Sequence, residues 1–311
     1  MIESIAIAGT GTMGASMAQV CAGRGYKVYL YGRAESSLEK GRRLIAVSQD
    51  LLVEQGVLTQ ARSEEIVSRI ELTTALECMG QADIISENIL ENLESKLEFF
   101  RKIDPLVKEG CIVTTNTSGL SINAIAEGVS RKENFAGMHW VNPPHLMPLV
   151  EIIRADKTAK ATTEAIAAFL RSLGKEPVLV QKDAPGFVLN RLQFAIVREA
   201  LHIVESGIAS AEDVDAAFKY GLGIRYACCG PFETIDLGGV DTFSAITKYL
   251  FRDLDDSKAG SPFLASLVER GRTGVKSGAG IYDYSGGRAE EAIRARDAKL
   301  LKVTEALFGK K

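Results

Sequence analysis

Short apolar segments alternate with amphipathic stretches over residues 1–185. The apolar segments are short enough for buried strands, whereas the stretches between them carry apolar residues at helical spacing, notably over 14–23 and 94–108. This alternation is typical of β-α-β units, and it predicts an α/β fold with a doubly wound parallel sheet and helices on both faces. The predicted strands are Ser4–Ala8, Lys27–Tyr31, Asp83–Ser86 and Cys111–Thr115.

The pattern changes after Pro185-Gly186, where strand signals nearly vanish apart from a short one at Gly280–Tyr284. Helical spacing then dominates, and it predicts an all-α C-terminal domain. We therefore expect two domains, 1–185 and 186–311. Within the first, Leu44–Arg69 has a helical pattern broken near Gly56, which predicts a helical hairpin. The predicted C-terminal helices are 187–207, 211–219, 241–253 and 290–307.

A glycine-rich turn follows the first predicted strand and opens a helix. It reads Gly9-Thr10-Gly11-Thr12-Met13-Gly14. In a dinucleotide-binding turn the first glycine permits the tight turn, the second lets the pyrophosphate approach the backbone, and the third lets the helix pack on the strand. The free N–H groups of the helix N-terminus attract phosphate. Its position at the first strand–helix junction of a β-α-β unit predicts a Rossmann-type domain that binds a nicotinamide dinucleotide.

The end of the second strand leaves the choice between NAD and NADP open. NAD-binding domains usually place a carboxylate there to accept from the ribose 2′-hydroxyl. This chain has Gly32 and then Arg33, and a guanidinium can pair with a 2′-phosphate. The alternative is an exposed Arg33, with Glu35 binding the ribose. The pattern leans slightly towards NADP.

Composition and charge exclude several other classes of protein. The 311 residues are 46% hydrophobic and carry a net charge of -3, with no basic excess for nucleic acid and no polybasic stretch for a membrane surface. No apolar run is long enough to span a bilayer, and the N-terminus lacks the pattern of a signal peptide. Five cysteines without a C-x-x-C pair, with three scattered histidines, predict no metal site. We expect a cytoplasmic protein with reduced cysteines.

One segment has the residues for proton transfer. Residues 137–151 contain His139 at the end of an apolar stretch, a turn rich in proline, and a second apolar stretch at 149–153 that predicts a returning strand. That path could bring Glu151 beside His139. An imidazole can take a hydroxyl proton as hydride leaves carbon, and a carboxylate on its other nitrogen fixes the tautomer. A purely structural histidine is the alternative from spacing alone.

This segment and the glycine turn resemble the L-3-hydroxyacyl-CoA dehydrogenase family, and the resemblance covers nearly the whole chain. It implies a dehydrogenase that interconverts a 3-hydroxy and a 3-keto group. Further motifs similar to those of the family are Asn116-Thr117-Ser118-Gly119-Leu120, Asp183-Ala184-Pro185-Gly186-Phe187-Val188-Leu189-Asn190-Arg191, Gly230-Pro231-Phe232-Glu233 and Gly274-Val275-Lys276-Ser277-Gly278.

The resemblance also implies roles for individual residues. It makes His139 the base and Glu151 its partner. Ser118 and Asn190 would bind the reacting oxygen and the surroundings of the histidine. The resemblance also places a further set of residues at the cofactor, in addition to the glycine turn and to Gly32 and Arg33 at the end of the second strand. These are Glu91, Lys96, Asn116, Ser118 and Asn142.

The substrate stays open at this point. The segment 44–60 contains no Lys or Arg, although acyl-CoA members of the family are lysine-rich there and CoA carries phosphate charges. The segment 221–231 resembles instead the branch with L-gulonate 3-dehydrogenase, lambda-crystallin and carnitine dehydrogenase. In it Arg225 could bind a substrate carboxylate.

We therefore expect a small free hydroxy or keto acid as substrate. The alternatives are a 3-hydroxyacyl-CoA such as 3-hydroxybutyryl-CoA, an aromatic carboxylate of the pyridine type, and a crystallin-like protein that binds cofactor without turnover. The resemblance also implies a homodimer formed through the helical domain. Apolar residues of the first C-terminal helix that could contribute are Phe194, Ile196, Val197, Leu201 and Val204.

Overall fold

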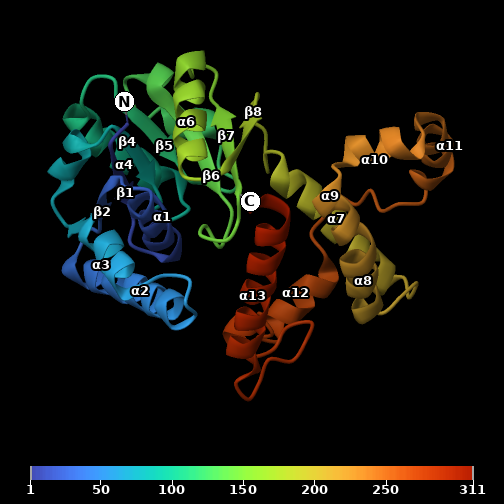
Figure 1. Cartoon of the computed structure of the whole chain (residues 1–311). Helices are drawn as coiled ribbons and strands as arrows, with labels where there is room; N and C mark the ends of the chain where they lie inside the picture. Colours follow the sequence, from blue (N-terminus) through green and yellow to red (C-terminus); the bar gives the residue numbers. More distant parts are fainter. Residues whose placement is uncertain (1, 310–311) are drawn as a thin grey trace. The chain divides into compact units, whose positions relative to one another are not determined.

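The computed structural model describes residues 2–309 and divides into two compact units, Met1–Asn190 and Arg191–Lys311 (Figure 1). Residues 186–190, which the sequence assigns to the C-terminal domain, group with the first unit. Phe187 is buried in the core of that unit, and the backbone after it bonds to a side chain of the sheet. The domain boundary at residue 186 stays a prediction.

The first unit is built on an eight-stranded sheet with the order β3-β2-β1-β4-β5-β6-β7-β8. Strands β1 to β6 run parallel to their neighbours, β7 is antiparallel to β6, and β8 is parallel to β7. The reversal arises at the proline-rich turn between β6 and β7. The strands are β1 (Ser4–Ala8), β2 (Lys27–Tyr31), β3 (Ile70–Thr73), β4 (Ile84–Glu87), β5 (Ile112–Thr115), β6 (Phe135–Trp140), β7 (Leu149–Arg154) and β8 (Glu176–Val180).

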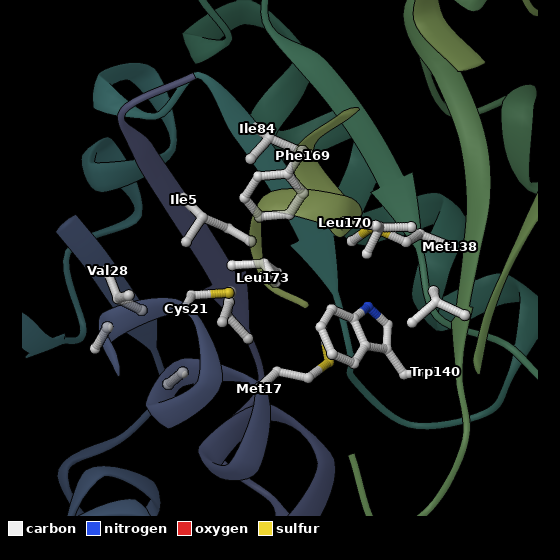
Figure 2. Packing of buried hydrophobic residues seen from close by; sticks show 14 of the residues in the cluster. Ile5, Met17, Cys21, Val28, Ile84, Met138, Trp140, Phe169, Leu170 and Leu173 are labelled. Atoms are coloured by element: carbon white, nitrogen blue, oxygen red, sulfur yellow. The ribbon is translucent and has the colours of Figure 1, made fainter. Parts of the chain in front are cut away.

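Apolar side chains cover both faces of this sheet, because the side chains of successive strand residues point to opposite faces. One core holds Ile5 and Ile7 of β1 with residues of α1 and α6, and the other holds Ala6 and Ala8 with residues of α4 and α5. Figure 2 shows Trp140 of β6 and Met17 of α1 in the first of these cores. The predicted α/β class is confirmed. The helices are α1 (Thr12–Gly23), α2 (Glu35–Glu54), α3 (Gln60–Ser68), α4 (Leu93–Ile103), α5 (Ile122–Ala126) and α6 (Lys160–Ser172).

The second unit is helical throughout its described residues, apart from loops and isolated bridges. The predicted short strand at Gly280–Tyr284 is wrong, because only single bridges form there, between Ala279 and its partners Gly274 and Asp283. A wide π-helical turn at Phe218–Leu222 joins α8 to α9. The helices are α7 (Leu189–Glu205, which begins in the first unit), α8 (Ala211–Ala217), α9 (Gly223–Cys228), α10 (Pro231–Gly238), α11 (Val240–Leu250), α12 (Pro262–Glu269) and α13 (Arg288–Phe308).

None of the helices within residues 2–309 combines the length and apolar composition that a membrane crossing requires.

Candidate active site

The glycine turn between β1 and α1 has the shape that a dinucleotide needs. Gly9 has φ +116°, and a Cβ there would lie 2.4 Å from the carbonyl oxygen of Asn88 on the loop after β4. A Cβ on Gly14 would lie 1.9 Å from the Gly9 carbonyl oxygen, so only glycine lets the helix approach the turn. Gly11, which precedes α1, has open space where its Cβ would stand. With Thr12 and Met13 opening the helix and no acidic residue in the first turn, the site fits a pyrophosphate.

The end of β2 presents a cation and no free carboxylate. Arg33 is exposed and makes no hydrogen bond or ion pair among the described residues, whereas Glu35 is paired with Arg42 at 2.9 Å. Gly32 is buried, and a Cβ there would stand 2.9–3.1 Å from carbons of Leu38, Thr10 and Ser37. A larger residue at position 32 would therefore disturb the packing of the turn.

His139 and Glu151 face each other on β6 and β7, where they are direct partners in the antiparallel register. The Nδ1 atom of His139 lies 2.8 Å from Oε2 of Glu151, and both side chains are buried. Burial raises the pKa of Glu151, but hydrogen bonds from His139 and from the backbone N–H groups of Leu189 and Val188 outweigh burial and bring this pKa below its ordinary value. An ionised carboxylate only accepts, so Nδ1 carries the proton and Nε2 is left to receive one.

Ser118 and Asn190 stand on the other side of the imidazole. The Oγ atom of Ser118 lies 3.1 Å from His139 Nε2, and the side-chain amide of Asn190 donates to the Ser118 carbonyl oxygen at 3.1 Å. Ser118 is exposed to solvent, so Nε2 of His139 faces the side of the site that a substrate can reach. The four residues that the sequence places in catalysis are thus brought together within the first unit.

A buried ion pair beside this group was missed by the sequence analysis. Lys96 and Glu87 are both fully buried, with 2.6 Å between Nζ and Oε1. Thr115 donates to the second Glu87 oxygen at 2.5 Å. Burial raises the pKa of Glu87, opposed by Lys96, Thr115 and the backbone of Ile89, and the net pKa is raised. The sequence signal that could have indicated this pair is the carboxylate of Glu87 at the end of an apolar strand.

Glu91 joins this pair to the serine loop. Its Oε2 lies 3.4 Å from Lys96 Nζ, while its Oε1 accepts from the hydroxyl of Thr117 and from the backbone N–H of Ser118 at 3.1 Å. Glu91 is exposed and can contact a cofactor, whereas Lys96 has no exposed side chain. The expected contact of Lys96 with the cofactor stays a prediction.

The two asparagines of the predicted set have different surroundings. The Asn116 side chain accepts from the backbone N–H of Trp140 at 3.0 Å and donates to Asn88 at 2.7 Å, so it joins the ends of β5, β6 and β4. Asn142 is exposed in the turn after β6 and has no hydrogen bond from its side chain among the described residues.

Arg225 belongs to the second unit. It lies on α9, directly after the π-helical turn, and is exposed with no side-chain partner in residues 2–309. Within the same residues, no group of three or more His, Cys, Asp or Glu side chains is placed to hold a metal ion.

Family models match both parts of the chain. Residues 4–184 match the NAD-binding domain of 3-hydroxyacyl-CoA dehydrogenase, and residues 186–284 match its C-terminal domain. The chain belongs to the 3-hydroxyacyl-CoA dehydrogenase family. The resemblance stated from the sequence is thereby confirmed, and the chain is a dehydrogenase with an NAD-binding domain.

Two relatives show how similarity is distributed within the family. A 5-formyl-3-hydroxy-2-methylpyridine 4-carboxylate 5-dehydrogenase of Mesorhizobium japonicum is 34% identical over all 311 residues and over its own full length. A 3-hydroxybutyryl-CoA dehydrogenase of Clostridioides difficile is 36% identical over 90% of this chain and 99% of its own.

Solved structures of the same two kinds of enzyme are also similar to this chain. The crystal structure of a pyridine-carboxylic acid 5-dehydrogenase, described as an NAD+-dependent dismutase, covers both chains completely with a TM-score of 0.91 and 34% identity. The (S)-3-hydroxybutyryl-CoA dehydrogenase of Ralstonia eutropha covers 92% of this chain and 100% of its own, with a TM-score of 0.77 and 35% identity.

Proposed function

We propose that this dehydrogenase interconverts a hydroxyl and a keto or aldehyde group on a small free carboxylic acid, with His139 as general base and Glu151 as its partner. The contact between His139 and Glu151 carries the chemical part of this proposal. Bound NAD supplies the hydride acceptor in the direction of oxidation. As the hydride leaves carbon, Nε2 of His139 takes the hydroxyl proton, and the Glu151 carboxylate stabilises the imidazolium that forms.

The remaining residues of the site orient the substrate oxygen. Ser118 Oγ stands at the imidazole nitrogen that receives the proton, so it can donate to the same oxygen that His139 deprotonates. Asn190 and Glu91 fix the backbone of Ser118 from two sides. The Gly9–Gly14 turn would hold the pyrophosphate, and the resemblance assigns Glu91 and Asn142 to the cofactor site.

A free acid is favoured over a CoA thioester by the coverage of the relatives. The pyridine-carboxylate enzyme matches the whole chain, whereas the 3-hydroxybutyryl-CoA enzymes cover about nine-tenths of it with a lower TM-score. In addition, α2 from residue 44 onward has no basic residue and exposes Val47, Asp50 and Leu51. This part of α2 offers no cation to CoA phosphates, and the basic residues Arg42 and Arg43 lie just before it. Arg225 is the cation that we assign to the substrate carboxylate.

A matched substrate panel tests this assignment. NAD reduction is measured for 3-hydroxybutyrate, for pyridine carboxylic acids with a hydroxymethyl group, and for 3-hydroxybutyryl-CoA, and NADH oxidation is measured for pyridine carboxylic acids with a formyl group. We expect the highest kcat/KM with a free acid, and Arg225→Ala to raise KM for free acids without a comparable effect on the thioester. A higher kcat/KM with the thioester would favour the acyl-CoA alternative. Tight cofactor binding without turnover of any substrate would favour the crystallin-like alternative.

NADP is proposed as a tolerated second cofactor. The support is the exposed Arg33 guanidinium, which has no partner within residues 2–309, and the lack of a carboxylate at Gly32. The NAD+ dependence of the pyridine-carboxylate relative favours NAD, so the two cofactors are to be compared directly.

We also propose a homodimer formed through the helical unit. None of the apolar side chains described after residue 190 is buried, and Phe232 is 82% exposed. A helical unit of this size ordinarily buries a core of its own, so this exposure supports a partner surface over these residues. Sedimentation at micromolar concentration should give twice the mass of one chain, and a monomer would contradict the proposal. A cytoplasmic location is proposed from the five free cysteines.

A further inference from the structure

Lys175 is a buried lysine that no step of the chemistry uses. It directly precedes β8, and its residue is only 6% exposed. Its ammonium donates to the carbonyl oxygens of Pro144 at 2.6 Å and Met147 at 2.8 Å. It also lies 5.6 Å from the centre of the Trp140 ring. Among residues 2–309 no carboxylate is bonded to it, so the partners that the structure describes for this buried charge are neutral.

The two carbonyls belong to the turn that joins the His139 strand to the Glu151 strand. Within this turn the Pro143 carbonyl accepts from the backbone N–H groups of Leu146 and Met147, and the Pro148 carbonyl accepts from that of Glu176. The carbonyls of Pro144 and Met147 receive the Lys175 ammonium instead. Lys175 therefore supplies hydrogen bonds that the turn does not make within its own backbone.

The turn also touches the helix that begins at the dinucleotide site. Nδ1 of His145 lies 3.2 Å from the Oγ of Ser16 on α1. The exposed Asn142, expected at the cofactor, opens the same turn. Lys175 on one side and Ser16 on the other thus fix the turn that presents Asn142. The His139–Glu151 pair has its own supports, the strand register and the N–H groups of Val188 and Leu189.

We propose that Lys175 is a positioning residue for the reaction, which holds the turn 142–148 and with it Asn142 in the working position. A buried charge without a counter-ion costs stability, so a residue of this kind is hard to explain by stability alone. The proposal rests on the dehydrogenase activity of the site and not on the identity of its substrate.

The test compares Lys175→Met with Lys175→Arg, and with Lys157→Met as the control at an exposed lysine after β7. Trp140 is the single tryptophan of the chain, so its fluorescence reports on this turn without any substrate. We expect Lys175→Met to change the emission and to lower kcat about 10- to 100-fold, the scale of a displacement of about 1 Å. The variant should stay folded, and the KM for NAD should change less than kcat. Lys175→Arg should recover most of the activity, and Lys157→Met should change neither readout.

Two results would overturn the proposal. One is Lys175→Met with wild-type kcat, whatever its fluorescence, since Lys175 would then be structural only. The other is Lys175→Arg that is folded but as inactive as Lys175→Met, since charge and donors would then not be what the turn requires. If Lys175→Met does not fold, Lys175→Gln, which keeps an amide donor without the charge, is measured against the same two criteria.

Discussion

Glu151 and His139 occupy directly opposed positions of β7 and β6, with 2.8 Å between the carboxylate and Nδ1. The register of two antiparallel strands therefore sets the orientation of the imidazole. The second Glu151 oxygen accepts from the backbone N–H groups of Val188 and Leu189, each at 2.9 Å, at the start of α7. The carboxylate is thus held from two sides, and the proton-accepting Nε2 is held with it.

Replacing His139 should remove turnover and spare cofactor binding. In His139→Gln we expect kcat to fall about 10²- to 10⁴-fold, the usual loss for a general base. The dissociation constant of NAD should stay within about threefold of wild type, because the pyrophosphate is bound at the glycine turn. Steady-state rates and titration of the Trp140 fluorescence with NAD measure the two quantities. A variant with full turnover would show that His139 is not the base.

Glu151→Gln tests the partner of the base. An amide keeps the shape of the side chain but cannot stabilise the imidazolium by its charge, so we expect kcat to fall about 10- to 100-fold, less than for His139→Gln. Glu164→Gln, at an exposed position of α6, is the control and should keep the wild-type rate. Equal rates for Glu151→Gln and this control would contradict the assignment.

The sequence predicted the parts of the site that local patterns encode. The glycine turn and strands β1, β2, β4, β5 and β7 follow from spacing and alternation, whereas β3 and β8 were not predicted. Spacing left the His139–Glu151 pair open, and the motifs of the family supplied its role together with those of Ser118 and Asn190. Glu87 and Lys175 were missed because their meaning depends on contacts between distant segments. Lys96 bonds Glu87 from the next helix, and Lys175 reaches carbonyls some thirty residues earlier in the chain. The single bridges at 279 looked like a strand because a short apolar run does not specify a partner.

The buried pair of Lys96 and Glu87 should matter strongly for stability. Lys96→Met leaves the Glu87 carboxylate buried without its cation, and such a loss typically costs about 3–5 kcal/mol in the free energy of unfolding. The double variant Lys96→Met/Glu87→Gln should recover part of this loss because no charge is then left unpaired. Urea denaturation measures both.

The exposed pair of Lys102 and Glu98 is the matched control. These residues are also a lysine and a glutamate on α4, at 2.7 Å, but both are about two-thirds exposed. Lys102→Met should change the free energy of unfolding by less than about 1 kcal/mol. If Lys96→Met lowered the free energy of unfolding by no more than Lys102→Met does, the buried pair would not stabilise the first unit.

Arg33 should determine how well NADP is accepted. A guanidinium–phosphate contact contributes about 1–3 kcal/mol, so Arg33→Ala should weaken NADP binding by roughly 5- to 150-fold and leave NAD binding nearly unchanged. Arg33 is a better position for this test than Gly32, where a side chain would meet Leu38 and Thr10. The measurement is the ratio of kcat/KM for the two cofactors. A wild-type preference for NAD of a hundredfold or more would contradict the proposed tolerance of NADP.

Lys175 should make stability depend on pH in the alkaline range. Burial lowers the pKa of Lys175 from 10.5 to about 8, with smaller effects of Cys21, which raises this pKa, and Arg24, which lowers it. Between these two pH values the unfolded chain holds the proton and the folded chain has lost it, so the contribution of this lysine to the free energy of unfolding rises with pH.

The size of this effect follows from the shift, which corresponds to about 3 kcal/mol between pH 8 and 10.5. Below pH 8 Lys175 is protonated in both the folded and the unfolded chain, and burial of its charge then destabilises the folded state in full.

The buried thiol of Cys21 acts in the opposite direction. Burial raises the pKa of this thiol to about 12, so its contribution to the free energy of unfolding falls above pH 9. The difference between wild type and Lys175→Met removes most of this second effect, since both proteins contain a buried Cys21 and the charge of Lys175 affects the pKa of this thiol less than burial does. Urea denaturation at pH 7, 8, 9 and 10 should show wild type gaining stability relative to Lys175→Met above pH 8. A difference that is constant with pH would mean that Lys175 does not titrate in this range, and that its charge is better solvated than its burial indicates.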